Sequence, residues 1–235
     1  MPKIHFILVE PAVPENVGGS ARAIKTMGFN SLRLVNPCEY KSGKAQWLAH
    51  ASTEVLNDAK VFTSLKDAIA DMDFVIGSSA KARSAKGDHH PAEIIPKLIS
   101  EKQNSISNIA IVFGREESGL TNEELQLCDI STFIPMQTTY PSLNLSQAVM
   151  LYAYLLSRLN DTHPDKSDRD KTCLVSPPEL KFVALKKEVV HLLSDTKISS
   201  NPNIYNRIFE RLALLGDNDI NLVLSILAAL REKGK

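Results

Sequence analysis

The sequence has few cysteines and no excess of either charge. Its three cysteines, Cys38, Cys128 and Cys173, are odd in number and far apart, so neither a disulfide framework nor a cysteine zinc site is expected. Basic and acidic residues number 27 each, and residues 161–235, with 12 and 11, are as balanced as the rest. Because no broad electropositive surface is expected, any nucleic-acid contact has to be a local patch.

Long apolar runs are also missing. The N-terminal segment MPKIHFILVE has one basic residue and an apolar run too short for a secretory signal. No stretch approaches the ~20 apolar residues that a membrane-spanning helix needs. Together with the cysteine usage, this predicts a cytoplasmic protein without a membrane partner. The 235 residues, 43% of them hydrophobic, suffice for one large domain or a medium domain with a small one.

Strand and helix signals alternate over the first 160 residues. Apolar strands are expected at Ile4–Val9, Leu32–Val35, Phe74–Ile76, Ile109–Phe113 and Thr132–Ile134. Helices are expected at Asn16–Met27, Gln46–Asn57 and about Asn144–Leu159, with capping pairs Ser64/Asp67 and Thr121/Glu124. This alternation predicts an α/β fold, a parallel sheet with helices on both faces. Ligands of such sheets bind at the carboxyl ends of the strands.

The remainder of the chain has a different composition. Residues 161–178 are polar, contain three prolines and are predicted to be a linker after a domain of residues 1–160. Residues 179–235 show apolar positions at helical spacing in about three segments. This small all-helical extension has too little core to fold alone, so we expect it to pack against another surface.

The stretch ENVGGSARAIKTMG is the first that could carry chemistry. We expect Asn16 to cap the helix, with Gly18 and Gly19 in its first turn and Arg22 beyond. Each glycine costs a helix about 1 kcal/mol relative to alanine. Such glycines allow a phosphate, or another backbone, to come close. Taken alone, a capped helix with a surface arginine explains the stretch equally well.

Two further stretches follow predicted strands. In IVFGREESGLTNEEL, Gly114 permits close approach of a ligand, and Glu116 and Gly119 belong to a tight turn. In FIPMQTTYPSLNLSQAV, the residues Ser142, Asn144 and Ser146 crowd at the start of an apolar helix that needs only one cap. Either this helix has more caps than it needs, or the additional polar groups face a ligand.

A fourth stretch, GSSAKARSAKGDHH, contains the densest short basic cluster. Lys81, Arg83 and Lys86 belong either to a solvated loop or to a contact with a phosphate backbone. His89 and His90 are adjacent and point in different directions, so no metal site is expected here.

Taken together, these stretches resemble the SPOUT superfamily of RNA methyltransferases. Asn16 to Arg22 resembles the first motif, FGREESGL the second and IPMQTTYPSLNLSQAV the third, over roughly residues 3–160. The chain looks closest to the TrmH/TrmJ branch, which methylates ribose 2′-hydroxyls, and within it to the TrmJ-like group. The resemblance implies a C-terminal deep trefoil knot, S-adenosylmethionine as methyl donor, and a homodimer with its active sites near the interface.

The motif match also implies roles for particular residues. The cofactor pocket would use Ser78, Ser79, Ala80, Gly114, Ile134, Met136, Ser142 and Leu143. Arg22 would orient the ribose and its phosphate, and Ser142 and Asn144 would bond the hydroxyl. Glu116 would hold Arg22 or the loop, and Asn16 would fix the start of the helix. No metal is needed.

The substrate implied by the resemblance is tRNA, with rRNA as an alternative. A different class of function is a non-catalytic RNA-binding protein that keeps the knot and the donor pocket. A third is an unrelated nucleotide-binding α/β enzyme, which would carry a glycine-rich loop after its first strand. The chain has EPAVPENVGG there, with two prolines, and fits that third class poorly.

Overall fold

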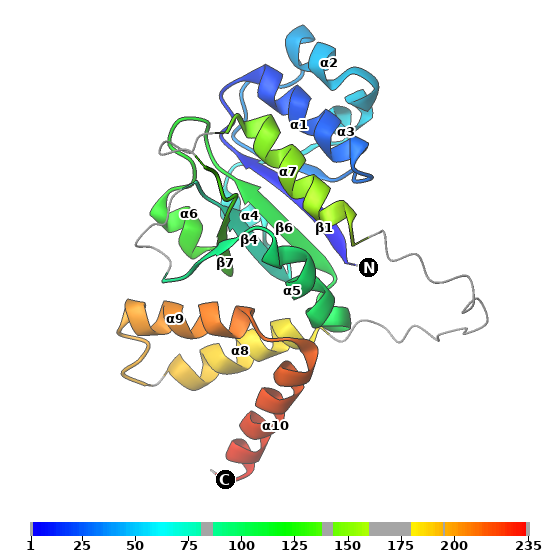
Figure 1. Ribbon diagram of the computed structural model, residues 1–235. Helices are drawn as coiled ribbons and strands as arrows, with labels where there is room; N and C mark the ends of the chain where they lie inside the picture. Colours follow the sequence, from blue (N-terminus) through cyan, green and yellow to red (C-terminus); the bar gives the residue numbers. More distant parts are fainter. Residues whose placement is uncertain (1, 81–86, 138–142, 160–179, 195, 234–235) are drawn as a thin grey trace, which may run out of the picture.

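The computed structural model describes residues 2–80, 87–137, 143–159, 180–194 and 196–233 (Figure 1). Seven strands form one sheet in the order β3-β2-β1-β6-β4-β7-β5, and every neighbouring pair is parallel. The strands are β1 (Lys3–Val9), β2 (Leu32–Val35), β3 (Lys60–Phe62), β4 (Phe74–Ser78), β5 (His89–Pro91), β6 (Asn108–Phe113) and β7 (Ile130–Phe133). The predicted parallel sheet is confirmed, although the three-residue edge strands β3 and β5 were not predicted.

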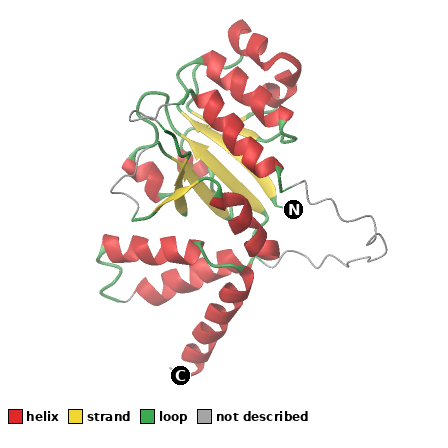
Figure 2. Ribbon diagram, viewed as in Figure 1, coloured by secondary structure: helices red, strands yellow, loops and turns green. Residues whose placement is uncertain are grey.

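Helices cover both faces of the sheet (Figure 2). On β1, Phe6 and Leu8 point to one face, whereas Ile7 and Val9 point to the other. The first face packs against α1 (Pro14–Thr26), α5 (Ile94–Lys102) and α7 (Leu145–Ser157), and the second against α4 (Leu65–Ala68) and α6 (Asn122–Gln126). Alternate residues of a strand are therefore buried in two different cores, which is why the strands are almost wholly apolar.

The helix predicted at Gln46–Asn57 is wrong in its extent. The structure has α2 (Gly43–Ala49), a 3₁₀ turn (His50–Ser52) and α3 (Thr53–Asn57). His50 has φ of 47°, in the left-handed region, so a regular helix cannot continue through it. Apolar periodicity alone did not reveal this break.

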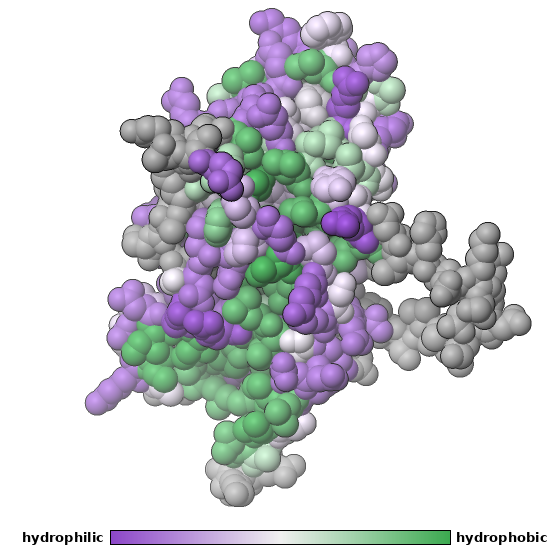
Figure 3. All heavy atoms as spheres, in the orientation of Figure 1, coloured by the Kyte–Doolittle hydropathy of each residue, from purple (hydrophilic) through white to green (hydrophobic). Residues whose placement is uncertain are grey.

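Three helices follow the α/β part: α8 (Lys181–Ser194), α9 (Pro202–Ala213) and α10 (Asp217–Lys233). They lie at the amino-terminal ends of the strands (Figure 1). Phe182, Leu185 and Val189 of α8 are buried in the main core. The helices thus pack on the sheet rather than stand alone, and α10 extends away from it. Apolar colour gathers over these helices in Figure 3, where large side chains remain exposed, among them Leu222, Ile226 and Leu230. None of the described helices has both the length and the apolar character that crossing a membrane requires.

Candidate active site at the carboxyl ends of the strands

A cavity of about 300 Å³ lies where β4, β6 and β7 end. It is lined by Ser78, Ser79, Ala80, Phe113, Gly114, Arg115, Glu116, Glu117, Ser118, Gly119, Ile134, Met136, Leu143, Leu145 and Ala148. The wall from β4 and the loop after β6 offers hydroxyls and carboxylates, while the wall leading into α7 is apolar. The site therefore suits a ligand that combines a flat apolar part with polar groups.

The structure brings together most of the residues predicted to bind the cofactor. Ser78, Ser79, Ala80, Gly114, Ile134, Met136 and Leu143 all line this cavity. Ser142 lies outside the described residues, as do Lys81, Arg83 and Lys86. Three segments that are far apart in the sequence thus meet at one edge of the sheet.

A buried tyrosine that the sequence did not single out packs behind Phe113, which lines the cavity. The hydroxyls of Tyr152 on α7 and Thr132 on β7 lie 2.9 Å apart, and the Thr132 hydroxyl donates to the Gly77 carbonyl at 3.2 Å. The Tyr152 ring meets Phe113 edge-on with centroids 5.2 Å apart. Burial raises the pKa of Tyr152, so it remains a neutral hydrogen-bonding group that fixes α7 to β4 and β7.

The loop after β6 is closed on itself. The backbone N–H groups of Arg115 and Gly119 each donate to the other residue's carbonyl, at 3.2 and 2.9 Å, and Gly119 has φ of 68°. A Cβ on Gly114 would lie 2.1 Å from the Gly119 carbonyl carbon, so only glycine fits there. The Arg115 guanidinium donates to Glu124 and Glu10, and these bonds raise its pKa. The predicted capping box of Thr121 and Glu124 is confirmed.

The structure differs from two expectations about the start of α1, which concerned Asn16 and Glu116. The helix begins at Pro14 with Val13 as its N-cap, and Asn16 is not the cap. Instead the Glu116 carboxylate accepts from Asn16 Nδ2 at 2.8 Å and from the backbone N–H groups of Ala12 and Val13 at 3.0 and 3.3 Å. It therefore holds this segment rather than Arg22. Partial burial acts to raise the pKa of Glu116, but these hydrogen bonds outweigh burial and lower it.

The crowded entrance of α7 is explained by a hydrogen-bond chain. Asn144 is the N-cap: its Oδ1 accepts from the Ser146 N–H at 2.9 Å and from the Ser146 hydroxyl at 2.7 Å. Its Nδ2 donates to Asn16 Oδ1 at 2.7 Å, and Asn16 in turn donates to Glu116. The polar groups thus connect α7, α1 and the loop after β6 around the rim of the cavity.

The glycine pair of α1 serves helix packing. A Cβ on Gly18 would lie 2.1 Å from the Ala45 carbonyl oxygen of α2, and one on Gly19 would lie 2.9 Å from Ser146 Cβ of α7. Of the two explanations open for these glycines, the structure favours close approach of protein groups over phosphate. α1 is thereby pressed between α2 and the start of α7.

Two other predicted features lie apart from the cavity. Arg22 is exposed on α1 and does not line it. His89 stacks on Phe133 at 4.7 Å between centroids, its Nδ1 lies 2.9 Å from the Ser131 hydroxyl, and burial lowers its pKa. Within the described part of the chain, no group of three or more potential ligands could hold a metal ion.

Comparisons with known proteins agree on one family. Residues 3–154 match the model of the SpoU rRNA Methylase family. The uncharacterized tRNA/rRNA methyltransferase LasT of Escherichia coli is 40% identical over 92% of both chains. The tRNA (cytidine/uridine-2′-O-)-methyltransferase TrmJ of Salmonella typhimurium is 34% identical over 99% of this chain and 98% of its own. A probable methylase family protein of Haemophilus influenzae superposes with a TM-score of 0.65 at 30% identity, over 99% of this chain and 97% of its own.

Proposed function

Because this chain belongs to the SpoU rRNA methylase family, we propose that it transfers the methyl group of S-adenosylmethionine to a ribose 2′-hydroxyl of tRNA. The chain is an S-adenosylmethionine-dependent RNA methyltransferase of the TrmH/TrmJ branch of the SPOUT superfamily. The name of the Salmonella relative specifies tRNA as its substrate and 2′-O-methylation as its reaction. Its sequence similarity to this chain extends over almost the whole of both chains. A tRNA substrate agrees with the cytoplasmic location expected from the sequence.

The observation that carries this proposal is the meeting of three separated motifs at one cavity. The residues that line it fit the donor: the hydroxyls of Ser78 and Ser79 suit its polar groups, and Ile134, Met136 and Leu143 suit the adenine plane. Only glycine can occupy position 114, because the Gly119–Leu120 backbone fills the space of a Cβ there, and this lets the loop close beside the cavity. We also propose that the C-terminal part of the α/β domain forms the deep trefoil knot of this superfamily.

When bound, the donor supplies an electrophilic methyl group whose bond to sulfur breaks as the bond to the ribose oxygen forms and the hydroxyl proton is released. The chain's own residues have to align the ribose with it, and alignment alone contributes several kcal/mol. Asn144 is exposed between the cavity-lining Leu143 and Leu145. One N–H of its amide goes to Asn16, and we assign the second, together with Ser142, to the ribose hydroxyl.

Arg22 is the residue we assign to the RNA phosphate beside the target. A guanidinium is a poor base at neutral pH but binds phosphate with two parallel hydrogen bonds. Since Arg22 is exposed outside the lining of its own cavity, we propose that the enzyme is a homodimer in which Arg22 serves the partner's cavity. Mixing Arg22→Ala chains with Gly114→Ala chains tests this, because only an arginine acting across the dimer would restore roughly a quarter of the wild-type activity.

The test of the function is methyl transfer from labelled donor to separate tRNA and rRNA pools, followed by digestion to nucleosides. We expect the label on ribose in nucleosides from tRNA. Label on rRNA alone would favour the second candidate, an rRNA 2′-O-methyltransferase, which the family description supports. Donor binding and RNA binding without any transfer would contradict an enzymatic role and leave a non-catalytic RNA-binding protein.

A further inference from the structure

The most exposed large hydrophobic side chain of the described residues lies outside the cavity. Trp47, the one tryptophan of the chain, is on α2 with 79% of its surface exposed. Tryptophan is usually well buried, since covering so large an aromatic surface is favourable. We propose that Trp47, with the lysines beside it, is a stacking platform for an unpaired base of the RNA substrate. This inference rests on the proposed function, because it needs an RNA substrate.

Trp47 is not required for the packing of α2. The helix is attached through small residues: Ala45 and Ala49 are fully buried, and Ala45 lies directly against Gly18 of α1. The Ser42 side chain accepts from the Ala45 N–H and caps the helix. The indole is therefore presented by a rigid helix whose own anchorage lies on its opposite side.

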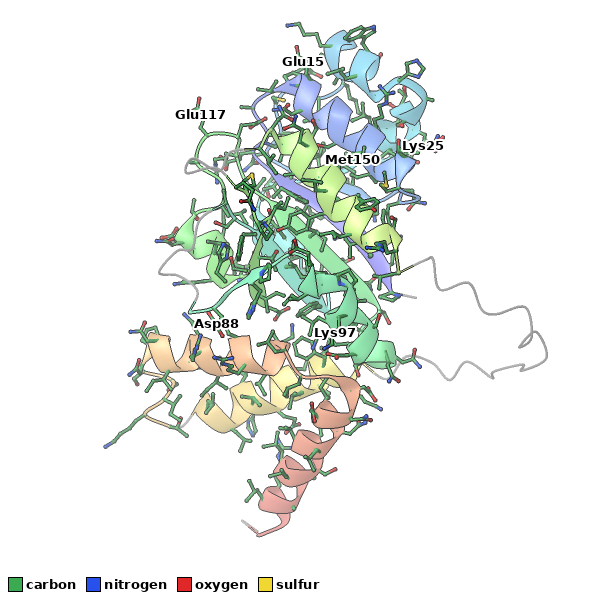
Figure 4. All side chains as sticks on the ribbon, in the orientation of Figure 1. Glu15, Lys25, Asp88, Lys97, Glu117 and Met150 are labelled. Atoms are coloured by element: carbon green, nitrogen blue, oxygen red, sulfur yellow. The ribbon has the colours of Figure 1, made fainter. Side chains whose placement is uncertain are left out.

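The charge around Trp47 complements RNA. No carboxylate occurs between Glu39 and Glu54, whereas Lys41, Lys44 and His50 lie in that segment, in a chain whose formal charge is zero. The Lys44 side chain is 76% exposed, and its Nζ lies 3.4 Å from Oε1 of Glu15, which Figure 4 labels on α1. Such an exposed ion pair is worth little and can be exchanged for a phosphate.

The neighbours of Trp47 favour RNA over a protein partner. Its exposed neighbours on α2 are Gly43, Lys44 and Gln46, so no other exposed residue of this helix carries a large apolar side chain. A base offers an aromatic plane next to a phosphate, and base–aromatic stacking tolerates any sequence. A second copy of the chain would instead need apolar surface around the ring.

The position of α2 relative to the cavity suits a flanking nucleotide. α1 lies between α2 and the start of α7, meeting them through Gly18 and Gly19 (Figure 1). Trp47 faces away from α1, so both α2 and α1 separate it from the rim of the cavity, a distance of about two helix diameters, roughly 20 Å. With a rise of about 3.4 Å per stacked nucleotide, roughly six nucleotides span that distance. The platform would hold a base near the target without touching the reacting ribose.

Because Trp47 is the only tryptophan, its fluorescence reports on this site alone. We expect a substrate tRNA to quench it, and an RNA oligonucleotide lacking bases to quench it much less. Trp47→Ala should raise KM for RNA about fivefold to a hundredfold, with kcat and the KM for S-adenosylmethionine unchanged. Trp47→Phe should restore most of the affinity and Trp47→Leu should not. Leu222→Ala, at a 61% exposed position on α10, is the matched control.

The inference is overturned if saturating RNA leaves Trp47 fluorescence unchanged, or if Trp47→Ala keeps the wild-type KM while the wild type methylates RNA. It is equally overturned if Trp47→Leu restores affinity, or if emission shifts with protein concentration in the absence of RNA, because a second copy would then cover α2. Quenching by RNA without methyl transfer would support the platform and contradict the proposed function, so the two failures are distinguishable.

Discussion

The two ends of the same parallel sheet are used in opposite ways. At the amino end, Asp73 accepts from the backbone N–H groups of Ser107 and Asn108, and Lys186 of α8 reaches Asp129 at 3.0 Å. Lys102 is fully buried there, under the rings of Phe74 and Phe182, and donates to the Leu215 carbonyl. Every charge named here has a partner, and helices close the surface.

At the carboxyl end the polar groups also pair, but around a space. Glu116, Asn16 and Asn144 connect three segments at the rim, and Arg115 closes the loop beside it. The cavity between them remains open. The comparison indicates that the ion pairs at the amino end stabilise the fold, whereas the hydrogen bonds and ion pairs at the carboxyl end shape the cavity that we propose as the donor site.

Adding a methyl group at the carboxyl end of the sheet should have the largest effect on donor binding. In Gly114→Ala the new Cβ would meet the Gly119 backbone at 2.1 Å, so the loop has to move. A misplacement of about 1 Å in an active site can cost about a hundredfold in rate, and we expect a loss of similar size in the affinity for S-adenosylmethionine, measured by calorimetry. Gly43→Ala, where a Cβ meets nothing within 4 Å, is the control and should bind normally. Equal affinities in both variants would contradict the account.

Lys102 at the amino end of the sheet should make the free energy of unfolding depend on pH in the alkaline range. Burial lowers the pKa of Lys102 from 10.5 to about 8. Between pH 8 and 10.5 the unfolded chain holds this proton and the folded protein does not, so the free energy of unfolding rises with pH, on the order of 3 kcal/mol in total. Lys102→Met should lack this rise in urea unfolding at pH 7.5 and 10. Parallel pH dependences of the two proteins would show that burial does not lower the pKa of Lys102.

Breaking an ion pair at the amino end of the sheet should lower the stability of the protein without affecting donor binding at the cavity. Asp129→Ala leaves Lys186 and the Val75 N–H without their carboxylate. We expect a loss of about 2 kcal/mol and a Tm lower by roughly 4–8 °C, with donor affinity unchanged. Glu101→Gln, which removes an exposed pair with Lys97, should stay within about 0.5 kcal/mol of wild type. A large loss of donor affinity in Asp129→Ala would contradict the claim that the amino end of the sheet serves stability alone.

The smallest expected effect is on stability and concerns Glu116 at the carboxyl end of the sheet. Its pKa is lowered in the folded protein, so its contribution to stability is present above the ordinary value of 4.5 and is lost as pH falls below it. Because the carboxyl is only partly buried and solvent screens its charge, we expect Glu116→Gln to cost below about 1 kcal/mol at pH 7 and nothing near pH 3 in thermal unfolding. A stability difference that persists at pH 3 would mean that shape, not charge, matters here.

The sequence predicted the strands because apolar runs have a direct local cause, whereas the residues that line the cavity were predicted from the resemblance to the SPOUT superfamily. It did not predict that Glu116 holds the segment that leads into α1, because that residue is about a hundred positions away in the sequence. Tyr152 was hidden within an apolar helix, although an isolated hydroxyl in such a run signals a buried hydrogen bond. The left-handed His50 has no local signal in the residue pattern.

Hydrogen–deuterium exchange with and without S-adenosylhomocysteine, the demethylated product, tests the central claim most directly. The account predicts added protection at residues 78–80, 114–119 and 134–145 and no change within Lys181–Ser194 or Asp217–Lys233. Protection confined to those C-terminal helices, or no protection at saturating ligand, would contradict the assignment of the carboxyl end as the donor site.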